Sequence, residues 1–227
     1  NHGNDDTIIF DLTKPLSCGP DVNFTTYDHL TAMTIRHKVK IIDEHELSFK
    51  IRDSNKVELI ELETQLKFDL QTRPNEAPVY NAAGSYFLAF GEPQKGINCF
   101  RKALTINPDN PDSLLNLGRI FYNLNYLDDA LYLAQRSLDV QLTTENSAWF
   151  HYFSVGEILK AKGDFQRANM HFRISAKLNP DFEPALDHLS KIELITEANI
   201  HFYVLIFVVC FVVMIANFIY PYNDNVE

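Results

Sequence analysis

The sequence predicts an all-α fold, a superhelix of stacked helical hairpins with an irregular N-terminal leader and one C-terminal transmembrane helix. The first observation is a repeat: Gly84, Gly118 and Gly156 recur 34 and then 38 residues apart, each inside a similar apolar frame. A period of this length is typical of a helical repeat array. The second observation is the run 200–220, which contains no Asp, Glu, Lys or Arg. About 20 apolar residues suffice for a helix to cross a membrane.

Residues 1–54 form the predicted leader. They combine Pro15, Gly19 and Pro20 with several Asp and Asn residues, a composition typical of extended or irregular chain. Such a segment can wrap the array. It also contains the sequon Asn23-Phe24-Thr25, so Asn23 is a candidate for N-linked glycosylation.

Residues 55–76 are predicted to cap the first repeat with a helix from about Asn55 to Thr72. Apolar residues recur there among Glu and Lys side chains, and the stretch ends before Pro74, as expected of a helix that stops ahead of a proline. The apolar residues are Val57, Ile60, Leu62, Leu66, Phe68 and Leu70.

Residues 77–182 divide into three units, 77–110, 111–144 and 149–182, each predicted to form one hairpin. The units place small and large apolar residues at matching positions: Tyr80, Ala83, Gly84, Phe87, Gly96, Phe100, Ala103 and Pro108 in the first; Leu114, Leu117, Gly118, Phe121, Ala130, Ala134 and Ser137 in the second; Tyr152, Val155, Gly156, Leu159, Ala168, Phe172 and Pro180 in the third. The second unit has Leu142 where a proline usually closes the repeat, and Glu145 to Ala148 are inserted before the third. The pattern is that of the tetratricopeptide (TPR) repeat.

The small residues are needed because two helices of a hairpin approach closely only where a side chain is absent or short. The large apolar residues then form a stripe that no single hairpin can bury, so the hairpins must stack. Residues 183–198 are predicted to form a helix that covers the open end of the third hairpin and terminates the array. Its apolar positions are Pro184, Leu186, Leu189, Ile192 and Leu194.

Residues 200–220 are predicted to be the transmembrane helix, followed by a short tail, 221–227. Phe202, Tyr203, Tyr220 and Tyr222 lie near the ends of the apolar run, where aromatic rings favour the headgroup boundary. A buried core helix is the alternative. A helix that is apolar on every face, however, has no place on an array of three hairpins.

The repeat region also resembles a known family. The runs RKALTINPDNPDSLLNLGRIFYNLNYLDDALYLAQRSL and HYFSVGEILKAKGDFQRANMHFRISAKLNPDFEPAL are similar to the C-terminal repeats of the tetratricopeptide repeat protein 17 family, and the resemblance covers residues 57–194. Members of that family resemble secretory-pathway proteins with a signal sequence, and some are connected with actin organisation and cilium formation. The resemblance implies a luminal array. This chain departs from the family by being far shorter and by carrying a membrane span.

The clues to orientation conflict. The chain begins with Asn rather than Met, which a removed signal peptide would explain, and the sequon also favours a luminal or extracellular array. Against this, Lys177 and Lys191 lie on the N-terminal side of the span, and Lys and Arg tend to stay cytosolic. We predict a single-pass glycoprotein of the secretory pathway or plasma membrane. The alternative is a tail-anchored protein on an organelle with its array in the cytosol, which the short tail also fits.

Cys18 and Cys99 leave two alternatives open. In an oxidising compartment they can pair in a disulfide that clamps the leader onto the second helix of the first repeat. Otherwise they are free or buried thiols.

Composition and motifs argue against several function classes. The net charge of -10 and the pI near 5.2 argue against nucleic acid or anionic lipid as the main partner. The chain has no glycine-rich phosphate loop, CxxC, HExxH or nucleophile elbow, which are the motifs of common catalytic sites. His29, His37 and His45 are evenly spaced, but nothing places them on one helical face, so we predict no metal site. We expect no enzyme activity, no cofactor and no small-molecule substrate.

TPR arrays bind partner segments in the concave groove lined by the first helix of each hairpin. The predicted groove residues are Asn81, Ser85, Asn116, Arg119, Asn123, Ser154 and Glu157, with plain solvation of these side chains as the alternative. The basic and amide side chains with which some TPR co-chaperones clamp a C-terminal carboxylate are missing, apart from Asn116. We predict a scaffold, accessory subunit or assembly factor of an integral membrane complex. A tail-anchored cytosolic adaptor or co-chaperone is the alternative.

Overall fold

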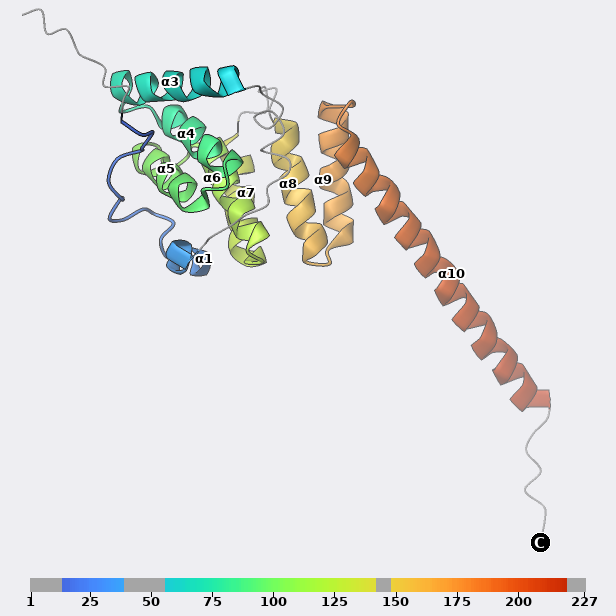
Figure 1. The fold of residues 1–227 in the computed structure, drawn as a ribbon. Helices are drawn as coiled ribbons and strands as arrows, with labels where there is room; N and C mark the ends of the chain where they lie inside the picture. The colour runs from blue at the N-terminus through green and yellow to red at the C-terminus, as the bar shows by residue number, and fades with distance from the viewer. Residues whose placement is uncertain (1–13, 39–55, 142–147, 220–227) are drawn as a thin grey trace, which may run out of the picture.

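The computed structural model describes residues 14–38, 56–141 and 148–219, and the regular structure in this part of the chain is helical (Figure 1). Helical hairpins follow one another and stack side by side. Figure 1 shows one helix lying across the first hairpin and a long helix leaving the array beyond the last. The all-α TPR array predicted from the repeat is therefore confirmed.

Three hairpins make up the array. The first pairs α4 (Ala77–Ala89) with α5 (Pro93–Ile106), the second α6 (Pro111–Asn123) with α7 (Leu127–Val140), and the third α8 (Ala148–Ala161) with α9 (Phe165–Leu178). Proline stands in the first turn of α4, α5 and α6, where its missing N–H costs no helical hydrogen bond. Apart from Ala148, the insertion before the third hairpin lies outside the described residues.

The turn inside each hairpin has the same backbone form. Gly91, Asn125 and Gly163 stand at corresponding positions with φ angles of 71°, 63° and 83°. Glycine adopts this left-handed conformation without strain, and asparagine tolerates it better than most residues. Sequence and backbone therefore agree that each hairpin closes in the same way.

Two of the repeating glycines lie where the helices of a hairpin touch. A Cβ atom added at Gly84 would lie 2.5 Å from the ring of Phe100, and one added at Gly156 would lie 2.7 Å from the ring of Phe172. Both rings are completely buried, so neither can move aside. The glycine recurrence in the sequence thus reflects direct contact between a helix backbone and an aromatic ring.

We expect Gly84→Ala to lower the free energy of unfolding by about 1–3 kcal/mol, the usual cost of overpacking a filled core. Alanine is the better helix former by about 1 kcal/mol, so a net loss must come from the clash with Phe100. Thermal unfolding in detergent, followed by circular dichroism, measures the change. Gly96→Ala is the comparison variant: its Cβ would lie 3.1 Å from the Gly84 carbonyl oxygen, a tight contact but a milder one than 2.5 Å, so its loss of stability should be smaller than that of Gly84→Ala. A Gly84→Ala protein as stable as the wild type would contradict the contact.

The leader is less irregular than predicted. It contains α1 (Thr31–Thr34) and a 3-10 helix η1 (Arg36–Lys38), and Tyr27, Leu30 and Met33 are buried in the main core. Burial of these apolar side chains against the array is a tertiary contact, which explains why local composition did not indicate helix. The leader does wrap the array in its described part, 14–38.

The helix α3 (Lys56–Thr72) packs on the first hairpin through only a narrow stripe of its side chains. Leu66 is 5% exposed, whereas Ile60 and Phe68 on the same helix are 57% and 41% exposed. The Tyr86 hydroxyl donates a hydrogen bond to Glu63 of α3 at 3.2 Å. The predicted cap is present, but it covers less apolar surface than its composition suggested.

A single helix, α10 (Glu183–Ile219), stands where two helices were predicted. Its first turns pack on α9, with Ala185 fully buried, and the chain then continues away from the array (Figure 1). The two helices are one because neither Gly nor Pro occurs between Pro184 and Ile219 to break the helix. Residues 201–216 are all exposed. Within the described residues, no helix combines the length and hydropathy that crossing a membrane requires.

Candidate functional site

The first helices of the three hairpins, α4, α6 and α8, line the face on which a TPR array is expected to bind. Asn116 of α6 donates from Nδ2 to Asn81 Oδ1 at 3.0 Å and to Ser85 Oγ at 3.3 Å, both on α4. Ser113 Oγ also donates to Asn81 Oδ1, at 3.1 Å. These bonds form a polar ladder between the first and second repeats.

A second polar cluster joins the second and third repeats. Arg119 of α6 donates from one terminal nitrogen to Ser154 Oγ at 2.8 Å and to Glu157 Oε2 at 2.9 Å on α8. Its guanidinium carbon lies 4.9 Å from the centre of the Phe150 ring, within the range of a cation–π contact. Arg119 and Ser154 are buried at 5% and 1% exposure. The positive charge of Arg119 in the second repeat is therefore paired with the carboxylate of Glu157 in the third.

The structure thus places the predicted groove residues between helices and not in an open row. All of them except the exposed Asn123 belong to one of the two clusters. The reason is that neighbouring first helices pack against each other, so polar residues on their shared side pair with one another. Spacing along one helix could not reveal this, because each partner lies 31 to 38 residues away.

A cavity of about 310 Å³ lies beside the second cluster, where α6, α8, α9 and α10 meet. Sequence reasoning missed it, because its residues come from four helices. The lining residues are Tyr122, Glu157, Lys160, Ala161, Phe165 and His188. An apolar wall with a few convergent polar groups is the usual character of a binding pocket.

His188 of α10 is a titratable group that lines this cavity, as do Glu157 and Lys160. Burial, together with the charge of Lys160, lowers the pKa of His188 to about 4. The imidazole is therefore neutral at pH 7, and its Nδ1 can accept a hydrogen bond from Lys160 Nζ at 2.9 Å. The ring also stacks on Phe172 with centroids 4.7 Å apart. This contact anchors α10 to the third hairpin while leaving the ammonium charge of Lys160 at the cavity.

The leader is held on the opposite side, against the second helices. Asp28 accepts from Arg101 of α5 at 2.6 and 3.3 Å, and the Arg101 side chain is 1% exposed. Burial alone would raise the pKa of Asp28, but hydrogen bonds from Arg101 and Thr25 outweigh it and hold that pKa below its ordinary value. Tyr27 Oη adds a hydrogen bond to the Pro108 carbonyl at 2.8 Å.

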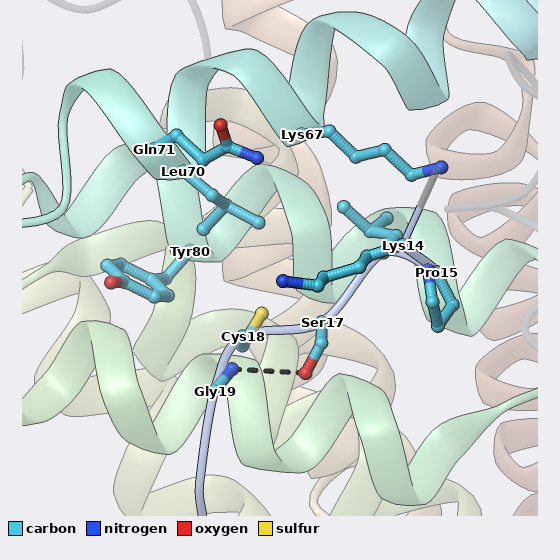
Figure 2. Close-up of a pocket in the computed structure, with 10 residues that line it drawn as sticks. Lys14, Pro15, Ser17, Cys18, Gly19, Lys67, Leu70, Gln71 and Tyr80 are labelled. Carbon is cyan, nitrogen blue, oxygen red and sulfur yellow. Dashed lines mark hydrogen bonds between the residues drawn. The ribbon is translucent and has the colours of Figure 1, made fainter. Parts of the chain in front are cut away.

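A disulfide joins Cys18 of the leader to Cys99 of α5, with Cα atoms 5.4 Å apart. Beside it lies a second cavity, of about 240 Å³, between the leader and α3. In Figure 2, Lys14 extends into the space between Leu70 of α3 and Cys18, while Lys67 points away along α3, where it pairs with Glu63 at 2.8 Å. The polar groups do not converge on one point, so we interpret this cavity as space between packed segments.

Replacing both Cys18 and Cys99 with serine should lower the free energy of unfolding by about 2–4 kcal/mol, because the cross-link closes a long loop and restricts the unfolded chain. The sequence separation is 81 residues. Thermal unfolding of the double variant measures the loss. Cys210→Ser, which alters an exposed free thiol, is the control. A wild-type protein whose thermal midpoint does not change on reduction would contradict a stabilising disulfide.

In the described part of the chain, His, Cys, Asp and Glu side chains form no cluster of three that could hold a metal ion. Asn23 is exposed. Thr25, the third residue of its sequon, is buried and donates from Oγ1 to Asp28 Oδ1 at 2.7 Å. The folded leader therefore leaves the Asn23 side chain room for a glycan.

Two models of the tetratricopeptide repeat match the sequence, over residues 77–110 and 99–132. The chain contains tetratricopeptide repeats. The first match coincides with the hairpin of α4 and α5, and the second runs from α5 to the first half of α7. TPR proteins are in general non-enzymatic binding proteins.

Among curated proteins, this TPR protein is a distant homologue of tetratricopeptide repeat protein 17. The human protein is 24% identical over 175 residues, which is 74% of this chain and 15% of the human one. Outer dynein arm-docking complex subunit 4 of Xenopus laevis is 29% identical over 50% of this chain and 22% of its own length. The chain thus spans only a small part of the relatives that it matches.

Among solved structures, the characterised pilF protein of Pseudomonas aeruginosa superposes with a TM-score of 0.55. It is 19% identical in sequence, and the match covers 73% of this chain and 70% of that protein. At this identity the likeness establishes the fold alone.

Proposed function

We propose that this TPR protein is a single-pass membrane protein whose array, in the lumen or outside the cell, binds other proteins as an accessory subunit or assembly factor of a membrane complex. The observation that carries the proposal is α10, which starts as the last packed helix of the array and continues into the apolar run 200–220. Its side chains over residues 201–216 are exposed. An exposed apolar helix of this kind needs a lipid or protein environment.

The leader supports the luminal or extracellular side. Disulfides persist in oxidising compartments and are rare in the cytosol, and Cys18 is bonded to Cys99. The exposed Asn23 lies in a sequon five residues further along. N-linked glycosylation of a sequon is a modification of secreted proteins, so both features favour the same compartment.

Membrane residence and side can be tested together on the full chain in microsomes. We expect it to resist alkaline extraction, to lose mass on glycosidase treatment, and to keep its array intact when protease is added to sealed vesicles. Asn23→Gln is the control and should abolish the mass change. An array digested in sealed vesicles, with Asn23 unmodified, would instead identify an organelle-anchored cytosolic adaptor. Release by alkaline extraction would refute the membrane span.

Partner binding is expected on the face formed by α4, α6 and α8. Partners recovered with the protein in mild detergent should be lost on Tyr122→Ala, because a half-buried aromatic beside a cavity is typical of an interface hot spot, worth about 2 kcal/mol or more. Met170→Ala is the matched control, since Met170 is 59% exposed on the outer helix α9. If Met170→Ala abolished partner recovery and Tyr122→Ala did not, the interface would lie on the face of α9 instead.

A further inference from the structure

The charges beside the cavity between α6, α8, α9 and α10 do not cancel. Arg119 donates to the carboxylate of Glu157 at 2.9 Å, so these two charges are paired. Lys160 has a different partner within the described residues: its ammonium lies 2.9 Å from Nδ1 of His188. That imidazole is neutral at pH 7, because burial and the charge of Lys160 lower its pKa to about 4. The hydrogen bond therefore uses one donor of Lys160 without neutralising its charge.

Asp187 of α10 leaves this balance unchanged. Its carboxylate accepts from Lys191 at 2.5 Å, and this hydrogen bond is the main reason that the pKa of Asp187 is lowered. Among the described side chains around the cavity, three cations therefore face two carboxylates: Arg119, Lys160 and Lys191 against Glu157 and Asp187.

Two further carboxylates follow on α10, at Glu193 and Glu197. They come five and nine residues after His188, and at 3.6 residues per turn they start about 140° and about 180° around the helix from it. The positions in register with His188 are Ile192 and Ile195, within about 40°. By register, neither carboxylate belongs to the face of α10 that lines the cavity.

Apolar groups stand beside Lys160 in the same cavity. The side chain of Tyr122 is half-buried, Phe165 is 42% exposed, and Ala161 adds a methyl group. The volume, about 310 Å³, is near the lower limit for a ligand site, so it suits one or two side chains of a partner better than a whole cofactor. An ammonium group beside aromatic rings is complementary to a segment in which an acidic residue adjoins an apolar one.

The cavity also lies close to the apolar run. Figure 1 shows α10 leaving the array as one continuous helix. Within it, His188 stands 12 residues before Ile200, which is about 18 Å at 1.5 Å per residue. If residues 200–220 span a membrane, the cavity is within reach of the segment of another membrane protein that adjoins the bilayer.

We propose that this cavity binds an acidic side chain with an apolar neighbour from the membrane-adjacent segment of a partner protein. Lys160 donates to the partner's carboxylate, which balances the charge, and the rings of Tyr122 and Phe165 contact the apolar neighbour. The inference rests on the proposed function and names the chemistry of its partner. Because α10 forms one wall, the site belongs to the third repeat together with the helix that carries the apolar run.

A zero-length cross-linker tests the contact directly, because a carbodiimide joins an amine only to a carboxylate that touches it. The full chain is treated in its native membranes, purified in mild detergent and digested, and the cross-linked peptides are identified by mass spectrometry. We expect Lys160 to be joined to an Asp or Glu of another protein, within about 12 residues of that protein's membrane span. Coupling of Lys160 to a carboxylate of this chain, Glu193 and Glu197 included, would overturn the inference.

Substitutions at Lys160 separate the positive charge from the reactive amine. Lys160→Arg should retain the partner while losing the cross-link. Lys160→Gln should lower the recovery of the partner about tenfold, because a hydrogen bond between charged groups is lost. Lys177→Gln changes an exposed lysine in the last turn of α9 and is the matched control, with no effect expected.

The outcomes distinguish this inference from the proposed function. Full recovery of the partner with Lys160→Gln would overturn the inference and leave the proposed function standing. If the wild type recovered no partner, the proposed function would fail, and this inference with it. A synthetic peptide of the cross-linked segment completes the test: replacing its acidic residue with the amide should weaken binding to the full chain about tenfold, and equal binding would overturn the role of the carboxylate.

Discussion

Asp28→Ala is expected to lower the free energy of unfolding by about 3–5 kcal/mol, because it leaves a charge buried without its partner. The Arg101 side chain is 1% exposed, and Asp28 accepts two of its hydrogen bonds. A buried guanidinium cannot lose its charge by deprotonation, so the array must either hold an unmatched cation or release the leader. Thermal and urea unfolding of the full chain in detergent measure the loss.

Asp21→Ala is the matched control for this prediction. Asp21 also joins the leader to α5, by accepting from Asn98 Nδ2 at 2.6 Å, but this bond is exposed. Its loss should cost about 0.5 kcal/mol or less. If the two variants lost equal stability, the buried ion pair would not be what holds the leader.

The same pair predicts a dependence on pH. The pKa of Asp28 is lower in the folded chain than its ordinary value of 3.8, so the stability it contributes is present above pH 3.8. That stability is lost as the pH falls through the lower folded value. The free energy of unfolding of the Asp28→Ala variant should therefore fall less steeply below pH 3.8 than that of the wild type. If the two proteins lost stability with the same dependence on pH, Asp28 would not be the group responsible.

Arg119→Ala should be the second most damaging change, at about 3 kcal/mol or more, because it leaves the carboxylate of Glu157 largely buried without its main partner. The Glu157 side chain is 13% exposed. The substitution also removes the contact with Phe150. Since both partners are on α8, we expect the third hairpin and α10 to separate from the first two hairpins before global unfolding.

Hydrogen exchange with mass spectrometry checks this order, and earlier exchange in α8 and α9 than in α4 and α5 is the expected result. Lys162→Ala is the matched control, because Lys162 pairs with Asp128 across the same repeat boundary but Asp128 is 93% exposed. Exposed pairs contribute about 0–1 kcal/mol. If Arg119→Ala proved neutral for stability yet abolished partner binding, Arg119 would be a ligand contact, as the sequence first suggested.

The predicted groove residues illustrate why a binding site is harder to derive than a fold. Asn81, Asn116 and Arg119 were chosen because they are polar and lie on the first helices. Polarity at such a position fits a ligand, solvent or a neighbouring helix equally well. The structure has them paired with neighbouring helices, and the open surface beside them comes from Tyr122, Lys160 and His188, which no single repeat brings together.

Features that depend on local physics could be predicted from the sequence alone. These are the three hairpins with their small residues at Gly84, Gly118 and Gly156, and the apolar run after Ile200. Helical period, turn chemistry and hydropathy are properties of neighbouring residues, so a single sequence carries them.

Contacts between residues far apart in the chain became known from the structure. Cys18 and Cys99 are separated by 81 residues, Asp28 and Arg101 by 73, and Arg119 and Glu157 by 38. Each pair forms because stacking of the hairpins, or the path of the leader over them, brings two distant side chains within reach. Spacing along the chain contains no record of that stacking. The sequence offered the pairing of Cys18 with Cys99 as one of two alternatives, whereas the Asp28–Arg101 ion pair, the two polar clusters and the cavity of His188 could be found only in three dimensions.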